Sequence, residues 1–356
     1  MKIDIIDNIQ KFNDIKTNWS DVYAADKHAT FFVSWPWLRG WFETIKKSWF
    51  IIALRNPEED RYVAFLPLRQ NRHRTHILMA GNDIATHTGI VCLPQHENTA
   101  LELFANYIQS QLKWDIFSLK NVSDIRIIKF LPFFSPKQHR LSYLESTPCP
   151  YLLLPENWND YLHGYLGKSS RQNLKRRTRQ IENLDNFRIT TIDRENADSQ
   201  IDAFIMLWKM RWGDRPDSDF LWLRNVSKYS LENGNLWLTI LWDGETPITG
   251  MKAYIDKWRK TFSFVMGGWN KQFIKHSPGN VMLGYSIKYA IENDFSRYDF
   301  LMGDEKYKYT FGGKHNLNKS YLIRRTELRQ KIKQGIRKAY NGYRKLKEIT
   351  ISEKGS

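Results

Sequence analysis

Residues 236–254 read LWLTILWDGETPITGMKAY, and this stretch decides the fold class. Two apolar runs rich in β-branched and aromatic residues flank the polar turn Asp243-Gly244-Glu245, a pattern typical of a β-hairpin. A similar stretch lies in the first half of the chain, where residues 49–54 and 62–68 flank a second polar turn. We therefore expect one hairpin in each half.

A strand that begins with an aromatic residue and an aspartate follows each hairpin. The separation is 65 residues from Trp49 to Trp114 and 61 residues from Trp237 to Tyr298. An aromatic helical segment precedes each hairpin, over residues 35–45 and 201–212. The repeat predicts an α/β (α+β) protein with two duplicated domains, each a mixed sheet flanked by helices. Chance similarity of two α/β halves is the alternative.

The predicted units are an N-terminal domain over residues 1–155, a C-terminal domain over residues 156–320 and a basic tail over residues 321–356. The tail has helically spaced apolar residues at positions 328, 332, 336, 339, 343 and 346. This spacing predicts an amphipathic helix with a basic outer face. The helix either packs on the second domain or contacts an anionic membrane surface.

The composition indicates a globular cytosolic protein. With 42% hydrophobic and 14% aromatic residues, the 356-residue chain is not of the disordered class. No run approaches about 18 apolar residues, the length of a membrane span, and residues 1–20 lack the pattern of a signal peptide. The two cysteines, Cys92 and Cys149, form no disulfide framework typical of a secreted chain. We expect a cytoplasmic location.

The net charge of +16 is concentrated in two segments. Residues 168–180 hold six Lys or Arg and no acid, and residues 321–356 hold eleven against three acids. Within the first segment, Arg171, Lys175 and Arg179 share one face of a predicted helix. This face is either an ordinary solvated surface or a clamp for a phosphate or sugar-acid group.

The best clue to chemistry lies between residues 277 and 308. Ser277-Pro278-Gly279-Asn280 opens a helical segment, and a helix N-terminus started by proline presents free N–H groups to an anion. The strand after this helix leads into Gly303-Asp304-Glu305-Lys306-Tyr307-Lys308, which supplies carboxylates, a phenol and ammonium groups. The combination predicts a phosphate-bearing donor beside a reactive centre, with an ordinary surface loop as the alternative.

Other catalytic classes lack their motifs. The chain has no Gly-x-Ser-x-Gly elbow, P-loop or dinucleotide fingerprint. The spacing of His73, His76, His87 and Asp83 fits no metal-ligand pattern, so we expect no metal.

In their order along the chain, several motifs resemble the BioF-like acetyltransferase group of the GNAT superfamily, which is associated with cellulose and exopolysaccharide genes. More distantly, the chain is similar to the Fem-type aminoacyltransferases of peptidoglycan synthesis. The resemblance covers most of the chain and rests on the motifs at residues 34–38, 65–68, 114–115, 171–177, 248–250, 277–279, 303–305 and 307–308.

The resemblance implies two GNAT-like domains, with the acyl-CoA in the second. It implies that the backbone of residues 247–254 pairs with the pantetheine arm and that residues 277–282 hold the pyrophosphate. The cofactor-binding residues are then Gly250, Met251, His276, Ser277, Pro278, Gly279, Asn280, Val281 and Met282. Only Gly279 stands where GNAT phosphate loops have a Gly-x-Gly or Gly-x-Ala pattern, which leaves the identity of the donor open. Fem-type relatives use aminoacyl-tRNA.

Acyl transfer from a thioester requires deprotonation of the acceptor and stabilisation of the thioester oxygen. We expect Asp304 to act as the general base or to orient the acceptor, ahead of Glu305, since adjacent strand residues face opposite ways. Tyr307 is the candidate acid for the departing thiolate. The predicted acceptor-binding residues are Trp35, Arg171, Lys175, Arg215 and Lys308.

The sequence thus predicts an acyl-CoA-dependent N- or O-acyltransferase, with acetyl-CoA as the first candidate donor. The expected acceptor is a sugar or nucleotide-sugar precursor of the cell envelope or of an exopolysaccharide, bound in the groove between the domains. Two alternatives stay open: a Fem-like transferase that uses aminoacyl-tRNA, and a catalytically inactive GNAT-fold module that binds RNA or membrane.

Overall fold

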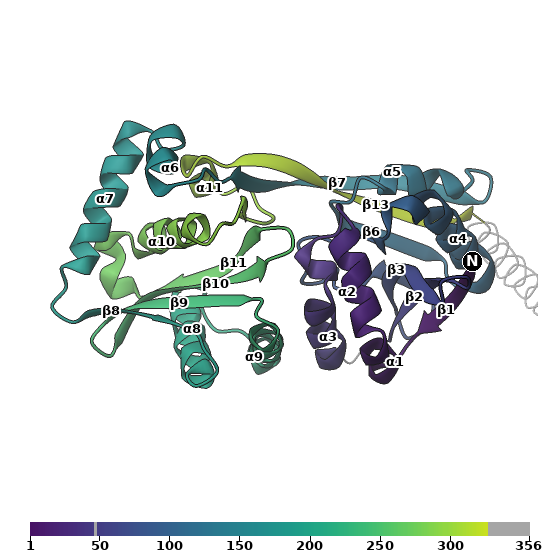
Figure 1. Cartoon of the computed structure of the whole chain (residues 1–356), viewed down its shortest axis with the longest axis horizontal. Helices are drawn as coiled ribbons and strands as arrows, with labels where there is room; N and C mark the ends of the chain where they lie inside the picture. The colour runs from purple at the N-terminus through teal and green to yellow at the C-terminus, as the bar shows by residue number, and fades with distance from the viewer. Residues whose placement is uncertain (46–47, 327–356) are drawn as a thin grey trace, which may run out of the picture.

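The computed structural model describes residues 1–45 and 48–326, so the predicted helix of the tail lies outside the described residues. Two α/β halves lie side by side along the longest axis of the molecule (Figure 1). The predicted α/β class is confirmed. None of the helices in the described part of the chain combines the length and the apolar character that a bilayer crossing requires.

The strands of the N-terminal half form one end of a mixed sheet that continues into the C-terminal half, and helices pack on it. Its strands are β1 (Lys2–Ile6), β2 (Trp49–Asn56), β3 (Arg61–Gln70), β4 (His76–Met79), β5 (Val91–Cys92) and β6 (Ile116–Val122). Its helices are α1 (Ile9–Asp14), α2 (Lys16–Ala25), α3 (Trp35–Thr44), α4 (Glu97–Gln111) and α5 (Ile127–Phe130).

The C-terminal half repeats this plan. Its strands are β8 (Phe187–Thr191), β9 (Leu236–Asp243), β10 (Thr246–Asp256), β11 (Thr261–Trp269) and β12 (Arg297–Asp299). Its helices are α6 (Trp158–Gly164), α7 (Lys168–Glu182), α8 (Ala197–Trp212), α9 (Asp217–Glu232), α10 (Pro278–Glu292) and α11 (Lys306–Thr310).

Both predicted hairpins form. β2 pairs antiparallel with β3, and β9 pairs antiparallel with β10. The β9–β10 turn places Gly244 at φ +57°, in the left-handed region that glycine adopts without steric cost. Local turn chemistry and alternation therefore predicted these elements correctly.

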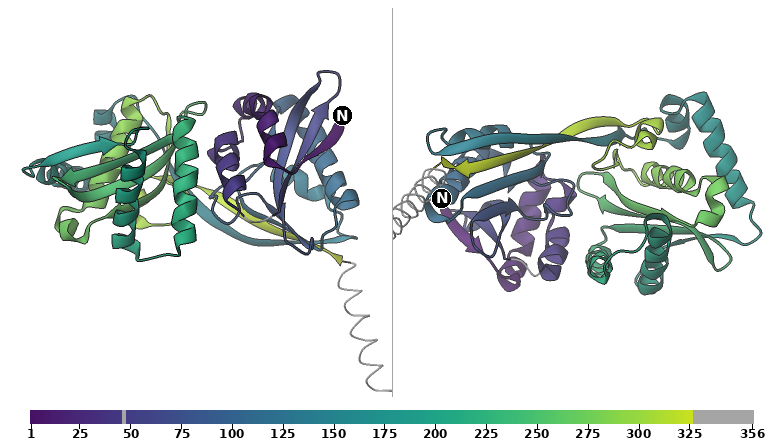
Figure 2. Two further views of the ribbon diagram at one scale, coloured as in Figure 1. Left: turned by 90° about the horizontal axis from the view of Figure 1, so that it is seen from below. Right: turned by 180° about the vertical axis from the view of Figure 1, so that it is seen from behind.

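Two long strands connect the halves. β7 (His139–Leu153) and β13 (Lys314–Arg325) pair antiparallel along their length and span the molecule (Figures 1 and 2). β7 also pairs with β12 in the C-terminal half, whereas β13 pairs with β6 in the N-terminal half. Because of this exchange, residues 321–325, which the sequence assigned to the tail, lie in β13 beside a strand of the first half.

The halves also pack on each other. The apolar core of the N-terminal half continues into residues of α8, α9, β9 and β10. Gly40 of α3 lies against α9, where an added Cβ would come within 3.4 Å of Tyr229 and 3.5 Å of Val226. Tyr254 of β10 stacks on Phe31 with ring centroids 4.6 Å apart. The contact therefore fixes the two halves against each other and encloses the space between them.

Candidate functional site

Strands β11 and β12 separate at the centre of the C-terminal half. They pair in parallel only through residues 261–263 and 297–299, and β12 then ends while β11 continues to Trp269. Beyond Ser263 no described strand pairs with this edge of β11. A bulge interrupts the β10–β11 register opposite Lys252 and Ala253. The separation leaves this edge of β11 without a strand partner within the described residues, so a ligand with amide groups can pair there.

A pocket of about 250 Å³ lies beside this open edge. We call it the donor pocket. The residues that line it come from α8, β10, β11, the segment before α10, α10 and α11: Arg211, Met251, Phe264, Trp269, Ile274, Ser277, Pro278, Gly279, Asn280, Leu283 and Tyr307. Elements separated by almost a hundred residues therefore meet at one site.

The N-terminus of α10 forms one wall of the donor pocket. Ser277 adopts φ +52° and ψ +54°, which turns the chain sharply into Pro278. The 15-residue helix directs the positive end of its dipole at the pocket. Pro278 has no N–H, and the N–H groups of Asn280 and Val281 donate to the Ser277 carbonyl oxygen, which leaves the Gly279 N–H as the unpaired donor of this turn among the described residues. A Cβ on Gly279 would lie 3.2 Å from the Trp269 ring, so a side chain here would crowd the ring and narrow the approach. The wall suits an anionic group such as a phosphate.

Arg211 of α8 and Tyr307 of α11 both line the donor pocket. The Arg211 guanidinium donates through Nη1 to the Gly267 carbonyl oxygen at 3.0 Å and lies 3.7 Å from the centroid of the Trp269 ring. Burial lowers the pKa of Arg211 to about 10, which leaves it charged at neutral pH. Burial, together with the nearby Glu305 carboxylate, raises the pKa of Tyr307 to about 12. Tyr307 therefore stays a protonated phenol that can donate.

Residues 168–309 match the family described as "Acetyltransferase (GNAT) domain". The match covers α7 to α11 and includes every residue of the donor pocket. No curated protein matches the sequence.

Several solved structures share the fold over nearly the whole chain. The structure of FemX has a TM-score of 0.62 at 12% identity, over 90% of this chain and 97% of that chain. A tandem GNAT protein from the clavulanic acid biosynthesis pathway has a TM-score of 0.52 at 9% identity, over 91% of this chain and 98% of that one. The C-terminal domain of a putative lysylphosphatidylglycerol synthetase from Agrobacterium fabrum has a TM-score of 0.53 at 11% identity, over 88% of this chain and 92% of that chain. At these identities the likeness shows the fold alone, and it confirms the predicted tandem GNAT-like architecture.

The structure brings five of the nine predicted cofactor residues to the donor pocket: Met251, Ser277, Pro278, Gly279 and Asn280. Val281 and Met282 are buried in the core of the half. His276 ends the turn before α10 and does not line the pocket. Gly250 packs under α8, where a Cβ would meet Leu207 at 3.1 Å.

The predicted pantetheine strand is wrong. β10 holds residues 247–254 in the interior of the sheet, with β9 on one edge and β11 on the other. Its backbone is therefore already paired on both sides. The available edge belongs to β11, the next strand along the chain.

The predicted catalytic residues separate into two groups. Tyr307 lines the donor pocket. Asp304 and Glu305 lie in a loop before α11 rather than on a strand, because Gly303 adopts φ +122° and β12 ends at Asp299. The strand argument for their opposite orientation is therefore wrong. Asp304 Oδ1 accepts a hydrogen bond from Tyr309 Oη at 2.5 Å, while Glu305 acts on the pKa values of both Tyr307 and Arg211.

Two predicted acceptor residues are structural instead. Trp35 is 8% exposed in the core of the N-terminal half, where its Nε1 donates to the Phe12 carbonyl oxygen at 3.2 Å. Lys308 is 2% exposed, and its Nζ donates to the Met302 carbonyl oxygen and to Glu305 Oε2, each at 2.9 Å. The buried ammonium holds the loop before α11 in place and is not available to an acceptor.

The remaining acceptor candidates do not gather at one site. Arg215 is exposed in the loop between α8 and α9. Arg171 donates through Nη1 to the Leu162 carbonyl oxygen at 3.2 Å, and Lys175 lines a separate pocket on α7. Sequence reasoning missed Arg211, Phe264 and Trp269, which line the donor pocket.

A second cavity, of about 500 Å³, lies between the two halves. Its walls include Lys27, His87, Arg259, Ser263, Arg297 and Asp299. His87 Nε2 lies 3.9 Å from Asp299 Oδ2, and both side chains are 8% exposed. Burial lowers the pKa of His87, although Asp299 opposes the shift. We call this space the inter-half cavity; it begins where β11 and β12 start to separate, at Ser263 and Asp299.

Replacement of Gly279 tests the wall formed by α10. We expect Gly279→Val to weaken acetyl-CoA binding at least tenfold, because the side chain projects toward Trp269 and narrows the path to the helix N-terminus. Isothermal calorimetry measures the affinity, and far-UV circular dichroism checks the fold. Unchanged affinity in a folded variant would exclude this wall as a phosphate site.

Proposed function

We propose that the chain is an acyltransferase that moves an acyl group, with acetyl as the first candidate, from CoA to an amino or hydroxyl group of a cell-envelope or exopolysaccharide sugar precursor. One observation carries the proposal: the donor pocket joins an open strand edge, a helix N-terminus and a protonated phenol. The open strand edge fits the pantetheine amides of a thioester donor. The helix N-terminus fits its pyrophosphate, and the phenol fits its leaving sulfur.

The proposed chemistry uses groups of this chain only. The acceptor nitrogen or oxygen forms a bond to the acyl carbon while the carbon–sulfur bond breaks, and Tyr307 gives its proton to the leaving thiolate. A backbone N–H on the open edge of β11 stabilises the thioester oxygen. Glu305 replaces Asp304 as our first choice for the base, because it lies within electrostatic reach of Tyr307 and Arg211.

The acceptor is assigned to the inter-half cavity. Lys27 has no hydrogen bond or ion pair within the described residues, and it suits a phosphate or carboxylate on the acceptor. Ser263 and Asp299 offer hydroxyl and carboxylate oxygens that suit a sugar ring. The separation of β11 from β12 begins at these two residues, so an acceptor held there lies next to the route of the donor.

Direct measurement tests the donor. We expect acetyl-CoA to bind in calorimetry and to undergo slow thioester hydrolysis without an acceptor. Binding without turnover on any sugar precursor would favour an inactive module, and absence of CoA binding would refute the proposal. The part of the basic tail from residue 327 onward lies outside the described residues, and its contact with an anionic membrane is part of the proposal that vesicle flotation tests.

Aminoacyl-tRNA is the second candidate donor, since the six basic residues of α7 and its surroundings suit an RNA backbone. To bind a tRNA donor, the cations of the protein must neutralise several tRNA phosphates. Each neutralised phosphate makes the slope of log affinity against log salt concentration more negative by about 0.7 to 0.9. We expect tRNA to bind only at low salt, with no measurable binding at about 0.15 M, where acetyl-CoA still binds. Saturable tRNA binding at that salt concentration, together with no CoA binding, would reverse the assignment.

A further inference from the structure

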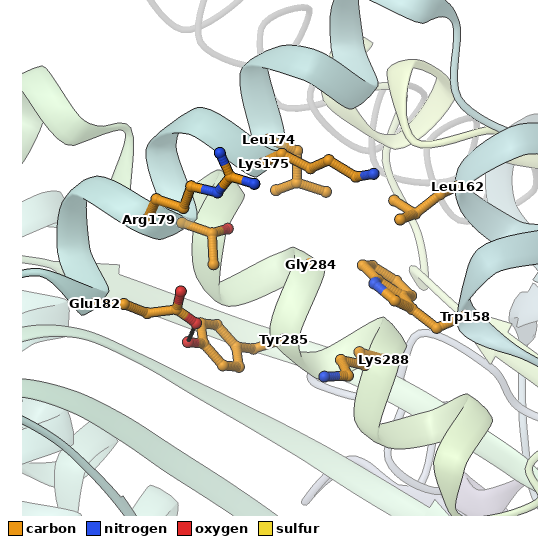
Figure 3. Close-up of a pocket in the computed structure, with 10 residues that line it drawn as sticks. Trp158, Leu162, Leu174, Lys175, Arg179, Glu182, Gly284, Tyr285 and Lys288 are labelled. Atoms are coloured by element: carbon orange, nitrogen blue, oxygen red, sulfur yellow. Dashed lines mark hydrogen bonds between the residues drawn. The ribbon is translucent and has the colours of Figure 1, made fainter.

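The cationic face of α7 covers a pocket that the reacting centre does not use. The pocket has a volume of about 270 Å³ and lies between α6, α7 and α10. Figure 3 shows Lys175 and Arg179 from α7, Trp158 from α6 and Lys288 from α10 around the space beside Gly284. We call it the α7 pocket.

Close contact between two helices shapes the α7 pocket. A Cβ on Gly284 would lie 2.9 Å from Leu174 Cδ1, so glycine allows Leu174 to seat on α10. Leu162 and Leu174 supply an apolar floor beside the Trp158 ring, which stacks on Tyr161 with centroids 5.1 Å apart. An aromatic ring of a ligand can therefore lie against Trp158 on an apolar base.

The cations of the α7 pocket are available to a ligand. The side chains of Lys175 and Arg179 make no hydrogen bond or ion pair within the part of the chain that the structure describes. The acid of the pocket, Glu182, already accepts a hydrogen bond from Tyr285 Oη at 2.5 Å. Lys288 pairs with Glu292 at 3.7 Å on the exposed side of α10. Two unpaired cations beside an indole match a nucleotide that carries an additional phosphate.

A small cavity lies between the α7 pocket and the donor pocket. It has a volume of about 70 Å³ and shares Ser277 and Asn280 with the donor pocket and Leu174 with the α7 pocket. Arg177 lines this small cavity. Gly284 follows Gly279 by five residues, which is about 7.5 Å along the helix at 1.5 Å per residue. A pyrophosphate at the start of α10 therefore lies within one nucleotide's reach of Lys175 and Arg179.

We infer that the α7 pocket binds the 3′-phosphorylated adenosine end of the donor, with the adenine ring near Trp158 and the 3′-phosphate between Lys175 and Arg179. The inference rests on the proposed function. It changes the role of Lys175 from binding the acceptor, as the sequence predicted, to binding the donor. Nucleoside phosphates also occur in nucleotide-sugar acceptors, so the test separates the two sources.

The experiment compares CoA with dephospho-CoA, which lacks the 3′-phosphate, by calorimetry. We expect the native protein to prefer CoA by about tenfold or more, because contacts between a phosphate and two cations are strong. In Lys175→Gln/Arg179→Gln the preference should fall below about twofold, while dephospho-CoA binds almost as in the native protein. The matched control is Lys168→Gln/Arg176→Gln, which removes two cations of α7 that do not line the pocket and should keep the preference.

An unchanged preference for CoA in the Lys175→Gln/Arg179→Gln protein would overturn the inference and leave the proposed function intact. Weaker binding of a uridine diphosphate sugar, with CoA unaffected, would also overturn it and return the pocket to the acceptor. If the native protein binds adenosine 3′,5′-bisphosphate through these two residues but does not bind acetyl-CoA, the result supports the α7 pocket as a site for this nucleotide and refutes acetyl-CoA as the donor.

Discussion

Tyr307→Phe should lose at least 100-fold in turnover with acetyl-CoA affinity close to that of the native protein. The change removes one oxygen atom and keeps the ring that lines the donor pocket. Without the phenol the thiolate must leave unprotonated, and general acid catalysis is worth about 10²- to 10⁴-fold. A 100-fold loss corresponds to about 2.7 kcal/mol of transition-state stabilisation. Steady-state kinetics and calorimetry on the same preparation separate the two effects.

Tyr309→Phe is the matched control. Tyr309 lies two positions further along α11, and its hydroxyl donates to Asp304 outside the donor pocket. We expect its turnover to stay within about threefold of the native value. A loss below tenfold for Tyr307→Phe, or equal losses in the two variants, would rule out Tyr307 as the acid.

The pH profile supplies an independent check. The acid form of Tyr307 must be present for the reaction, and burial holds its pKa at about 12. Turnover should therefore show no decrease from this group between pH 7 and about pH 10, since activity is lost only as the pH approaches the raised pKa. A basic limb centred near 10 that disappears in Tyr307→Phe would contradict the burial of this phenol.

Arg126→Met should cost about 3–5 kcal/mol of folding stability. Arg126 is 1% exposed in the N-terminal half, and its Nη2 donates to Asp26 Oδ2 at 2.9 Å and to Asp124 Oδ2 at 2.8 Å. Methionine fills much of the volume but leaves both carboxylates buried without a cation. Urea denaturation followed by tryptophan fluorescence measures the loss.

Arg61→Met is the control for this prediction. Arg61 pairs with Glu59 on the surface, where the side chains are 47% and 40% exposed. Exposed pairs contribute little, so the expected change is below about 1 kcal/mol. Similar losses in Arg61→Met and Arg126→Met would mean that the buried cluster is not a main source of stability in this half.

Features that depend on neighbours in the chain could be predicted from the sequence. The hairpin around Gly244 and the helix start at Pro278 follow from turn chemistry and capping within a few residues. The same reasoning identified Ser277, Pro278, Gly279 and Asn280, which line the donor pocket, whereas Met251 came from the family resemblance. These predictions required no knowledge of the distant chain.

Features that depend on long-range packing could not be predicted. Arg211 meets Gly267 across 56 positions, and no local pattern distinguishes it from the other cations of its helix. Leu301 and Gly303 adopt positive φ, which turns the chain out of the extended conformation after β12. Asp304 and Glu305 therefore do not lie on a strand, and the strand argument for their orientation is wrong. The burial of Lys308 depends on a loop that folds over it, and its sequence neighbourhood is that of a surface lysine.

The exchange of β13 into the first half has a consequence for synthesis on the ribosome. β6 ends at Val122 and its partner begins at Lys314, so 192 positions separate two strands that must pair. At about 5–20 residues per second, translation leaves that edge unpaired for roughly 10 to 40 s. An unpaired edge can join the wrong strand, and nascent chains are the nearest source of one. We therefore expect a stop codon before Lys314 to yield an aggregating product from both halves, and the complete polypeptide to depend on chaperones until its last strand emerges.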